Sequence, residues 1–130
     1  MNGPWLATLM TVVLCWVVSA VPIRVKDGDT FIARMPVWIG LEVTETVRVL
    51  GVDTPERKGA TLQAAEQAKR FTERWLVVEN GPVLVRACKR DSFGRILGRV
   101  TRQRLTEASA VDDLAEALVR AGHGASAKER

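Results

Sequence analysis

Apolar and polar residues alternate along several short stretches of the chain, which is typical of β-strands buried on one face. In residues 21–26, the apolar Ile23 and Val25 alternate with basic residues. Turn-forming residues separate such stretches, as Asp27-Gly28 does after this one. The expected strands are residues 21–26, 29–32 with a resumption at 37–39 after Met35-Pro36, 42–52, 83–88 and 95–101.

Two other stretches repeat apolar residues at helical spacing. The first helix is expected over residues 62–78, and the second from about residue 111 to Gly122. Residues 123–130 are polar, so we expect them to fray and to leave His123 exposed to solvent. The apolar positions of the first helix are Ala65, Ala68, Phe71 or Thr72, Trp75 and Val78.

Five short strands, with one helix between the third and fourth and another at the C-terminal end, predict a mainly β fold with helices (α+β). The arrangement is that of a five-stranded OB-type barrel. At 130 residues the chain has room for one domain.

The first twenty residues carry no Lys, Arg, Asp or Glu, and residues 5–18 are almost all apolar. Together with the small residues Ser19-Ala20, this pattern predicts a signal peptide over residues 1–20 and a secreted or periplasmic domain over residues 21–122. The alternative is an uncleaved membrane anchor that leaves the domain facing outside the cytoplasm.

Cleavage after Ala20 would remove Cys15, one of the two cysteines. Cys88 would then be alone in the mature chain, so no internal disulfide is expected.

The net charge of +4 and the pI near 9.6 favour an anionic partner, either nucleic acid or an acidic membrane surface. Ordinary solubility charge would account for the same totals.

The stretch 47–56, with the sequence VRVLGVDTPE, concentrates the candidate chemistry. It combines Arg48, Asp53 and Glu56 at the end of an expected strand and in the loop that follows. Strict alternation would put Arg48 and Asp53 on opposite faces. A bulge at Gly51, or a strand that ends before Asp53, is therefore needed to bring them together.

Three segments place charged residues at turns or strand ends: residues 27–30, 53–56 and 91–95. Carboxylates without His or thiolate partners suit Ca²⁺ or Mg²⁺. Arg48 and Arg95 suit a phosphate, because a guanidinium binds two oxygens at once. The set points to phosphodiester hydrolysis. Each residue alone has a simpler explanation, such as a turn residue for Asp29 or an ion pair with Asp91 for Arg95.

The sequence resembles the staphylococcal nuclease (thermonuclease) family from about residue 23 to residue 122. This resemblance implies an OB-fold nuclease that hydrolyses DNA and RNA, depends on Ca²⁺ and leaves 3′-phosphate products. The matching segments, in the family's order, are VKDGDTFIA, VRVLGVDTPE, DSFGR and LAEALVRAG.

The resemblance implies a role for each matching position of the metal site. Asp29 and Asp53 match the side-chain Ca²⁺ ligands, and Thr54 matches a residue whose backbone carbonyl binds the ion. Asp27 matches an acidic position that is near the metal without being a ligand.

The catalytic positions match as well. Glu56 corresponds to the general base that activates or orients the attacking water. Arg48 and Arg95 correspond to the pair that grips the scissile phosphate, with Arg95 also placed to assist the leaving 5′-oxygen. Phe93 occupies the place of an aromatic residue that packs on the nucleotide.

Two features keep other readings open. The chain has no tyrosine, and it ends soon after Gly122, where the family usually continues into another helix. A non-catalytic nucleic-acid-binding OB module, or a truncated inactive homologue, is therefore the alternative to a nuclease. In either case we expect a monomer without a stable protein partner.

Overall fold

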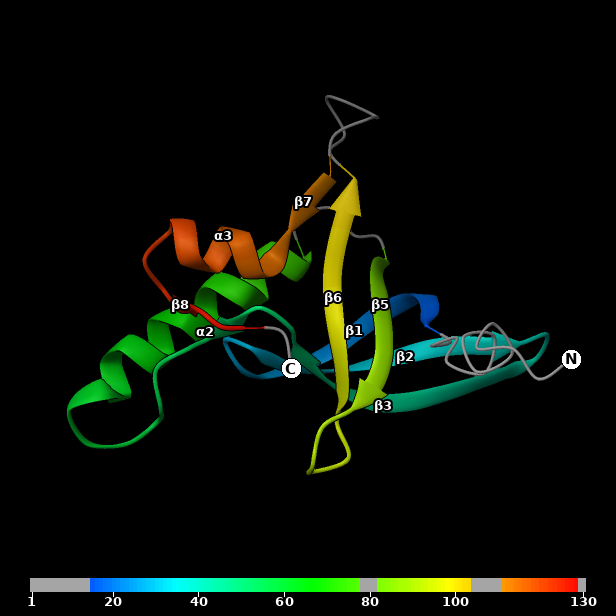
Figure 1. The fold of residues 1–130 in the computed structure, drawn as a ribbon, viewed down its shortest axis with the longest axis horizontal. Helices are drawn as coiled ribbons and strands as arrows, with labels where there is room; N and C mark the ends of the chain where they lie inside the picture. Colours follow the sequence, from blue (N-terminus) through cyan, green and yellow to red (C-terminus); the bar gives the residue numbers. More distant parts are fainter. Residues whose placement is uncertain (1–14, 78–81, 104–110, 129–130) are drawn as a thin grey trace, which may run out of the picture.

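The structure is a computed structural model that describes residues 15–77, 82–103 and 111–128. Its main feature is a six-stranded sheet in the order β3-β2-β1-β5-β6-β7, which a parallel pairing of β3 with β6 closes into a barrel (Figure 1). The expected OB-type barrel is thus confirmed. The strands are β1 (Trp16–Asp27), β2 (Thr30–Trp38), β3 (Leu41–Val49), β5 (Val83–Arg90), β6 (Ile96–Gln103) and β7 (Val111–Asp113).

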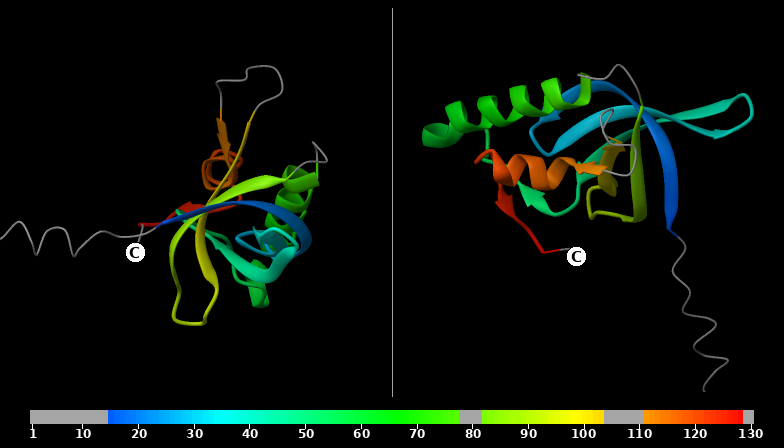
Figure 2. Two further views of the ribbon diagram at one scale, coloured as in Figure 1. Left: turned by 90° about the vertical axis from the view of Figure 1, so that its right-hand side faces the viewer. Right: turned by 90° about the horizontal axis from the view of Figure 1, so that it is seen from above.

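The long strand β1 joins the two halves of the barrel. Its first half pairs antiparallel with β5, from Trp16 opposite Ala87 to Ala20 opposite Val83. Its second half turns to pair with β2, which follows after a tight turn (Figure 2). One strand therefore supplies hydrogen bonds to both sides, and its apolar residues fill the space that the barrel encloses.

The predicted boundary at residue 20 cuts through β1. Val18 and Ala20 are buried in the core, so residues 15–20 belong to the folded domain. A strand buried among other strands is as apolar as a leader sequence, so the apolar pattern alone does not separate the two. The signal peptide predicted over residues 1–20 stays a prediction, and its first fourteen residues lie outside the described ranges.

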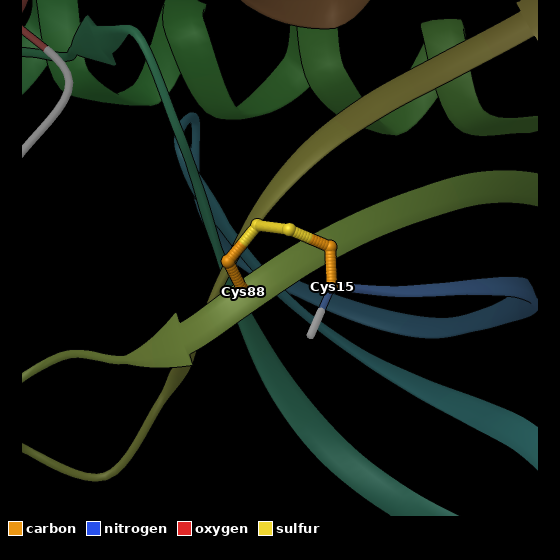
Figure 3. Close-up of a disulfide and its surroundings, with 2 residues drawn as sticks. All are labelled: Cys15 and Cys88. Carbon is orange, nitrogen blue, oxygen red and sulfur yellow. A yellow bond between two sulfur atoms is a disulfide. The ribbon is translucent and has the colours of Figure 1, made fainter. Parts of the chain in front are cut away.

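The expectation of an unpaired Cys88 was also wrong. Cys15, directly before β1, forms a disulfide with Cys88 on β5, across a sequence separation of 73 residues (Figure 3). The bridge follows from the strand pairing next to it, because Trp16 lies opposite Ala87 and so brings both cysteines to one end of the β1–β5 ladder.

Strand β2 runs through Met35-Pro36, where we expected an interruption. Its pairing with β1 ends at Arg34, so beyond that point β2 is bonded to β3 alone. A proline, which has no N–H, is tolerated on such an edge segment.

Two helices pack beside the barrel. Helix α2 (Leu62–Val77), preceded by a 3₁₀ turn η1 (Gly59–Thr61), confirms the first expected helix and contacts β1. Its buried residues include Ala65, Ala68, Thr72 and Trp75 as expected, with Leu76 in addition, whereas Val78 lies outside the described residues.

Helix α3 (Leu114–Arg120) begins three residues later than expected, because residues 111–113 form β7. The carboxylate of Asp113 accepts a hydrogen bond from the Glu116 N–H, and this cap fixes where the helix starts. Helix α3 also contacts α2, so the two helices form one layer against the barrel (Figure 1).

The C-terminal tail is more ordered than its composition suggested. Residues Ala125–Ser126 form β8, which pairs antiparallel with β4 (Val52–Asp53). The ring of His123 lies 5.1 Å from that of Phe71 on α2, so His123 is half-buried instead of exposed. For residues 123–128 the prediction of fraying was wrong, because backbone pairing holds this polar segment, whereas residues 129–130 lie outside the described ranges. Within the described ranges, no helix has the length and apolar character needed to cross a membrane.

Candidate active site

A turn at Leu50-Gly51 positions the stretch that the sequence singled out. Strand β3 ends at Val49, and Gly51 adopts a φ of +94°, which strongly favours glycine. Strand β4 begins directly after this turn, at Val52, and the side chain of Asp53 lies on the same side as that of Arg48. An Asp53 oxygen lies 2.5 Å from Nη2 of Arg48, so the sequence-based requirement for a bulge or a strand end is met.

Arg48 is the central side chain of this site. Its side chain is only 17% exposed, and its Nη1 donates to the carbonyls of Val49 and Val52, each at 2.8 Å. Its Nη2 contacts Asp53 and lies 3.4 Å from Oδ2 of Asp29. Because the contact distance to each carboxylate is short, the two carboxylates converge on one nitrogen atom of Arg48.

Asp29 is buried where the β1–β2 turn enters β2. Its Oδ1 accepts a hydrogen bond from the hydroxyl of Thr30, and its Oδ2 accepts one from the backbone N–H of Thr54. The second bond joins segments 25 residues apart in the sequence. Asp29 therefore fixes the loop after β4 to the barrel and holds Thr54 beside both carboxylates.

The turn between β5 and β6 supplies the second arginine. Asp91 accepts hydrogen bonds from the backbone N–H groups of Phe93 and Arg95, and also from Nε of Arg95 at 2.6 Å. The guanidinium of Arg95 lies 5.4 Å from the centre of the Phe93 ring. Since the contact to Asp91 uses Nε, both terminal nitrogens of Arg95 stay available to bind a ligand.

Both arginines open into one cleft of about 680 Å³ at the strand ends. The parallel pairing of β3 with β6 brings them there, since Arg48 lies opposite Leu97, two residues after Arg95. Phe93 lines an adjoining hollow together with Arg48 and Arg95. All the predicted metal and catalytic residues line the cleft: Asp29, Arg48, Asp53, Thr54, Glu56 and Arg95.

Glu56 is the most exposed of the predicted catalytic and carboxylate-ligand side chains. Its side chain is 75% exposed, and among the described residues it forms one ion pair, with Nζ of Lys58 at 3.3 Å. The side chain is therefore free to rotate toward the cleft that its residue lines. The roles predicted for Glu56 and its neighbours stay predictions, whereas their proximity is a feature of the structure.

The donors around Arg48 suit a hard cation. Asp29 and Asp53 offer carboxylate oxygens, and Thr54 adds a backbone carbonyl to the same cleft, with no thiolate or imidazole among them. In residues 15–77, 82–103 and 111–128 there is no group of three or more His, Cys, Asp or Glu side chains arranged to hold a metal. A cation here would therefore have two carboxylate ligands and would complete its shell with carbonyl and water oxygens.

Sequence reasoning missed Arg57, which also lines the cleft. Its guanidinium forms a very short contact with Glu66 of α2, lies 3.9 Å from Asp27 and donates to the carbonyl of Lys26. The hydrogen bond from Arg57 holds the pKa of Glu66 below its usual value. The signal in the sequence was a basic residue directly after Glu56.

The hydrogen bonds around Asp91 lead to a pH-dependent prediction. Burial raises the pKa of Asp91, but hydrogen bonds from Arg95 and Phe93 outweigh this effect and lower the pKa below the ordinary 3.8. A carboxyl whose pKa is lowered by folding stabilises the fold above its unfolded pKa and loses this contribution as the pH falls through its folded pKa.

We therefore expect Asp91→Asn to destabilise the protein at neutral pH, and the difference from wild type to shrink as the pH falls below 3.8. Urea unfolding of both proteins, from about pH 7 to about pH 3, measures this difference in the free energy of unfolding. A difference that stays constant over this range would contradict the role of the ionised carboxylate.

The fold and the cleft together define an OB-fold domain with a cleft at its strand ends that is lined by arginines and carboxylates. The model of the staphylococcal nuclease homologue family matches residues 46–130, well over half of the chain. The chain therefore belongs to this nuclease-type family, and the resemblance inferred from the sequence is confirmed. A search of curated proteins gave no significant match.

Proposed function

We propose that the chain is a calcium-dependent endonuclease that hydrolyses the phosphodiester bonds of DNA and RNA and leaves 3′-phosphate products. The observation that supports this is the composition of the cleft, which two arginines, two aspartates and an exposed glutamate line together. A module that only binds nucleic acid needs the arginines, but it has no use for a carboxylate pair that repels phosphate.

In this proposal, Asp29, Asp53 and the carbonyl of Thr54 would hold Ca²⁺, which would supply positive charge that offsets the charge of the scissile phosphate. The donor chemistry supports the assignment, because hard oxygen ligands suit this ion. Arg48 lies between the two carboxylates, and its positive charge reduces the repulsion between them.

The other residues act on the water and on the phosphate. Glu56 accepts a proton from the attacking water as the new P–O bond forms. The bond from phosphorus to the 5′-oxygen breaks, and Arg95 donates a hydrogen bond to this leaving oxygen, which takes a proton from solvent water. Arg48 and Arg95 bind the non-bridging oxygens, whose negative charge increases in the transition state. The products are a 3′-phosphate and a 5′-hydroxyl.

We also propose that the protein works as a monomer outside the cytoplasm, secreted or periplasmic. The Cys15–Cys88 disulfide supports this, because disulfides persist in oxidising compartments and are rare in the cytosol. A membrane-anchored form that faces outside the cytoplasm would meet the same condition.

The test is cleavage of single-stranded DNA and RNA by the full chain with Ca²⁺, with a chelator, and by the variant Glu56→Gln. We expect cleavage to require Ca²⁺, and Glu56→Gln to reduce the rate about 10²–10⁴-fold, because a positioned proton acceptor contributes that much. Glu42→Gln is the matched control, since Glu42 pairs with Arg34 on the β2–β3 hairpin and does not line the cleft.

Cleavage that survives the chelator would contradict the metal site, and full activity in Glu56→Gln would remove Glu56 from the mechanism. A folded wild-type protein that binds DNA without cutting it would instead support the non-catalytic binding module. End-group analysis of the products tests the position of the broken bond.

A further inference from the structure

A second hollow, of about 530 Å³, lies between strand β1 and helix α2. We call it the β1–α2 groove. One wall is formed by residues 22–26 of β1, and the other by Lys69, Glu73 and the last residues of α2. Arg57 closes one side of the groove. None of these wall residues belongs to the predicted catalytic or metal site.

The charge of the groove is positive. Arg24, Lys26 and Lys69 line it together with one carboxylate, Glu73, and with Arg57, whose charge is balanced by Glu66 and Asp27. The chain as a whole has 19 basic and 15 acidic residues, so the groove concentrates positive charge well beyond the average. The side chains of Arg24 and Lys26 are exposed, and within the described part of the chain neither forms an ion pair.

Apolar side chains lie among these cations. Ile23 is 53% exposed and Val77 is 64% exposed, and both line the groove. Exposed apolar side chains beside cations suit a ligand that has both bases and phosphates, because the bases can cover the apolar atoms while the cations contact the phosphates. A single-stranded nucleic acid exposes both its phosphates and its bases, whereas the bases of a duplex are stacked inside the double helix.

Arg57 connects the groove with the catalytic cleft, because it lines both hollows. Its contacts with Glu66, Asp27 and the Lys26 carbonyl hold it at the boundary between them. A nucleic-acid strand that extends from the cleft past Arg57 therefore enters a groove that is lined with cations.

We propose that the β1–α2 groove binds the backbone of a single-stranded nucleic acid beyond the bond that is cut. This inference rests on the proposed function for its role in cleavage, but it predicts binding that does not depend on catalysis. Affinity for long strands then comes mainly from the groove, and the chemistry stays in the cleft.

The test compares two double variants that remove the same charge. Arg24→Ala/Lys69→Ala removes a cation from each wall of the groove. Arg70→Ala/Arg74→Ala removes two exposed cations from α2 that do not line it. Fluorescence anisotropy of a labelled single-stranded DNA of about 12 nucleotides, with a chelator to prevent cleavage, measures binding. Circular dichroism checks that all proteins are folded.

We expect the groove variant to bind the DNA about tenfold more weakly near 0.1 M salt. The slope of log K against log salt concentration should become shallower by about 1.4, because each of the two lost phosphate contacts contributes about 0.7. The control variant should show a clearly smaller change. With Ca²⁺, the groove variant should lose kcat/KM on the long strand and keep it on a dinucleotide, which is too short to reach the groove.

Equal losses in the two variants, or no binding by the wild type, would overturn the inference. If the groove variant alone binds weakly while the wild type cuts nothing, the groove is supported and the proposed nuclease function fails. If the wild type cuts both substrates and the groove variant behaves identically, the nuclease stands and the groove proposal is wrong.

Discussion

A chain that begins at Val21 should fail to fold, whereas one that begins at Cys15 should unfold cooperatively. Residues Trp16–Ala20 provide the whole contact of β1 with β5, so without them β5 keeps only β6 as a neighbour and the barrel opens. Val18 is 5% exposed and Ala20 fully buried, and their removal leaves a hole in the core.

The magnitudes support a complete loss of the fold. Burial of a side chain such as Val18 contributes about 1.5–3 kcal/mol. A disulfide contributes typically about 2–4 kcal/mol, and the loop closed by Cys15 and Cys88 is long. With five paired residues of backbone added, the loss is comparable to the total stability of a domain, about 5–15 kcal/mol. Far-UV circular dichroism and urea unfolding of both chains measure the difference.

The double variant Cys15→Ser/Cys88→Ser separates the disulfide from the strand. It keeps β1, so it should stay folded with its free energy of unfolding lowered by about 2–4 kcal/mol. A reductant should lower the free energy of unfolding of the wild type by the same amount and leave that of the double variant unchanged. If the chain from Val21 is as stable as the chain from Cys15, the first half of β1 is not part of the domain.

Replacing either cleft arginine by alanine should reduce the cleavage rate about 10²–10³-fold, the usual effect of removing one donor to a transition-state charge. The two variants should differ in stability. The side chain of Arg95 contacts Asp91 and the Phe93 ring, both in its own turn, and Asp91 keeps its two backbone hydrogen bonds without it, so its loss should lower the unfolding midpoint less than the loss of Arg48 does.

Arg48→Ala should instead reduce both rate and stability. It leaves the carbonyls of Val49 and Val52 without their donor and two carboxylates without the cation between them. An unsatisfied buried polar group costs about 1–3 kcal/mol. Steady-state cleavage with Ca²⁺ and urea unfolding of the same samples measure the two effects.

Lysine variants sharpen this comparison, because lysine keeps the charge but cannot bind two oxygens at once. Arg95→Lys should therefore recover little of the rate. Arg34→Ala is the control, since Arg34 lies on the β2–β3 hairpin away from the cleft. An Arg95→Ala protein with the wild-type rate would exclude Arg95 from the chemistry. An Arg48→Ala protein with an unchanged midpoint would contradict its structural role.

Local patterns in the sequence determined most of the elements and the identity of the cleft residues. Alternation gave the strands of the barrel and helical spacing gave α2, since both patterns depend on residues close in the chain. The segments with Asp29, Asp53, Glu56 and Arg95 were recognisable for the same reason, because each carries its charged residues at a turn or strand end.

Only the tertiary structure decided how distant segments pair. Trp16–Ala20 is apolar enough to be read as a leader, and its pairing with β5 decides that it is a core strand and that Cys15 meets Cys88. The polar tail is ordered because β8 pairs with β4, and Arg48 reaches Asp53 because the chain turns at Gly51. These residues are far apart or on different elements, and they come together only because the barrel closes. A local pattern of apolar and polar residues does not encode which distant segments pair.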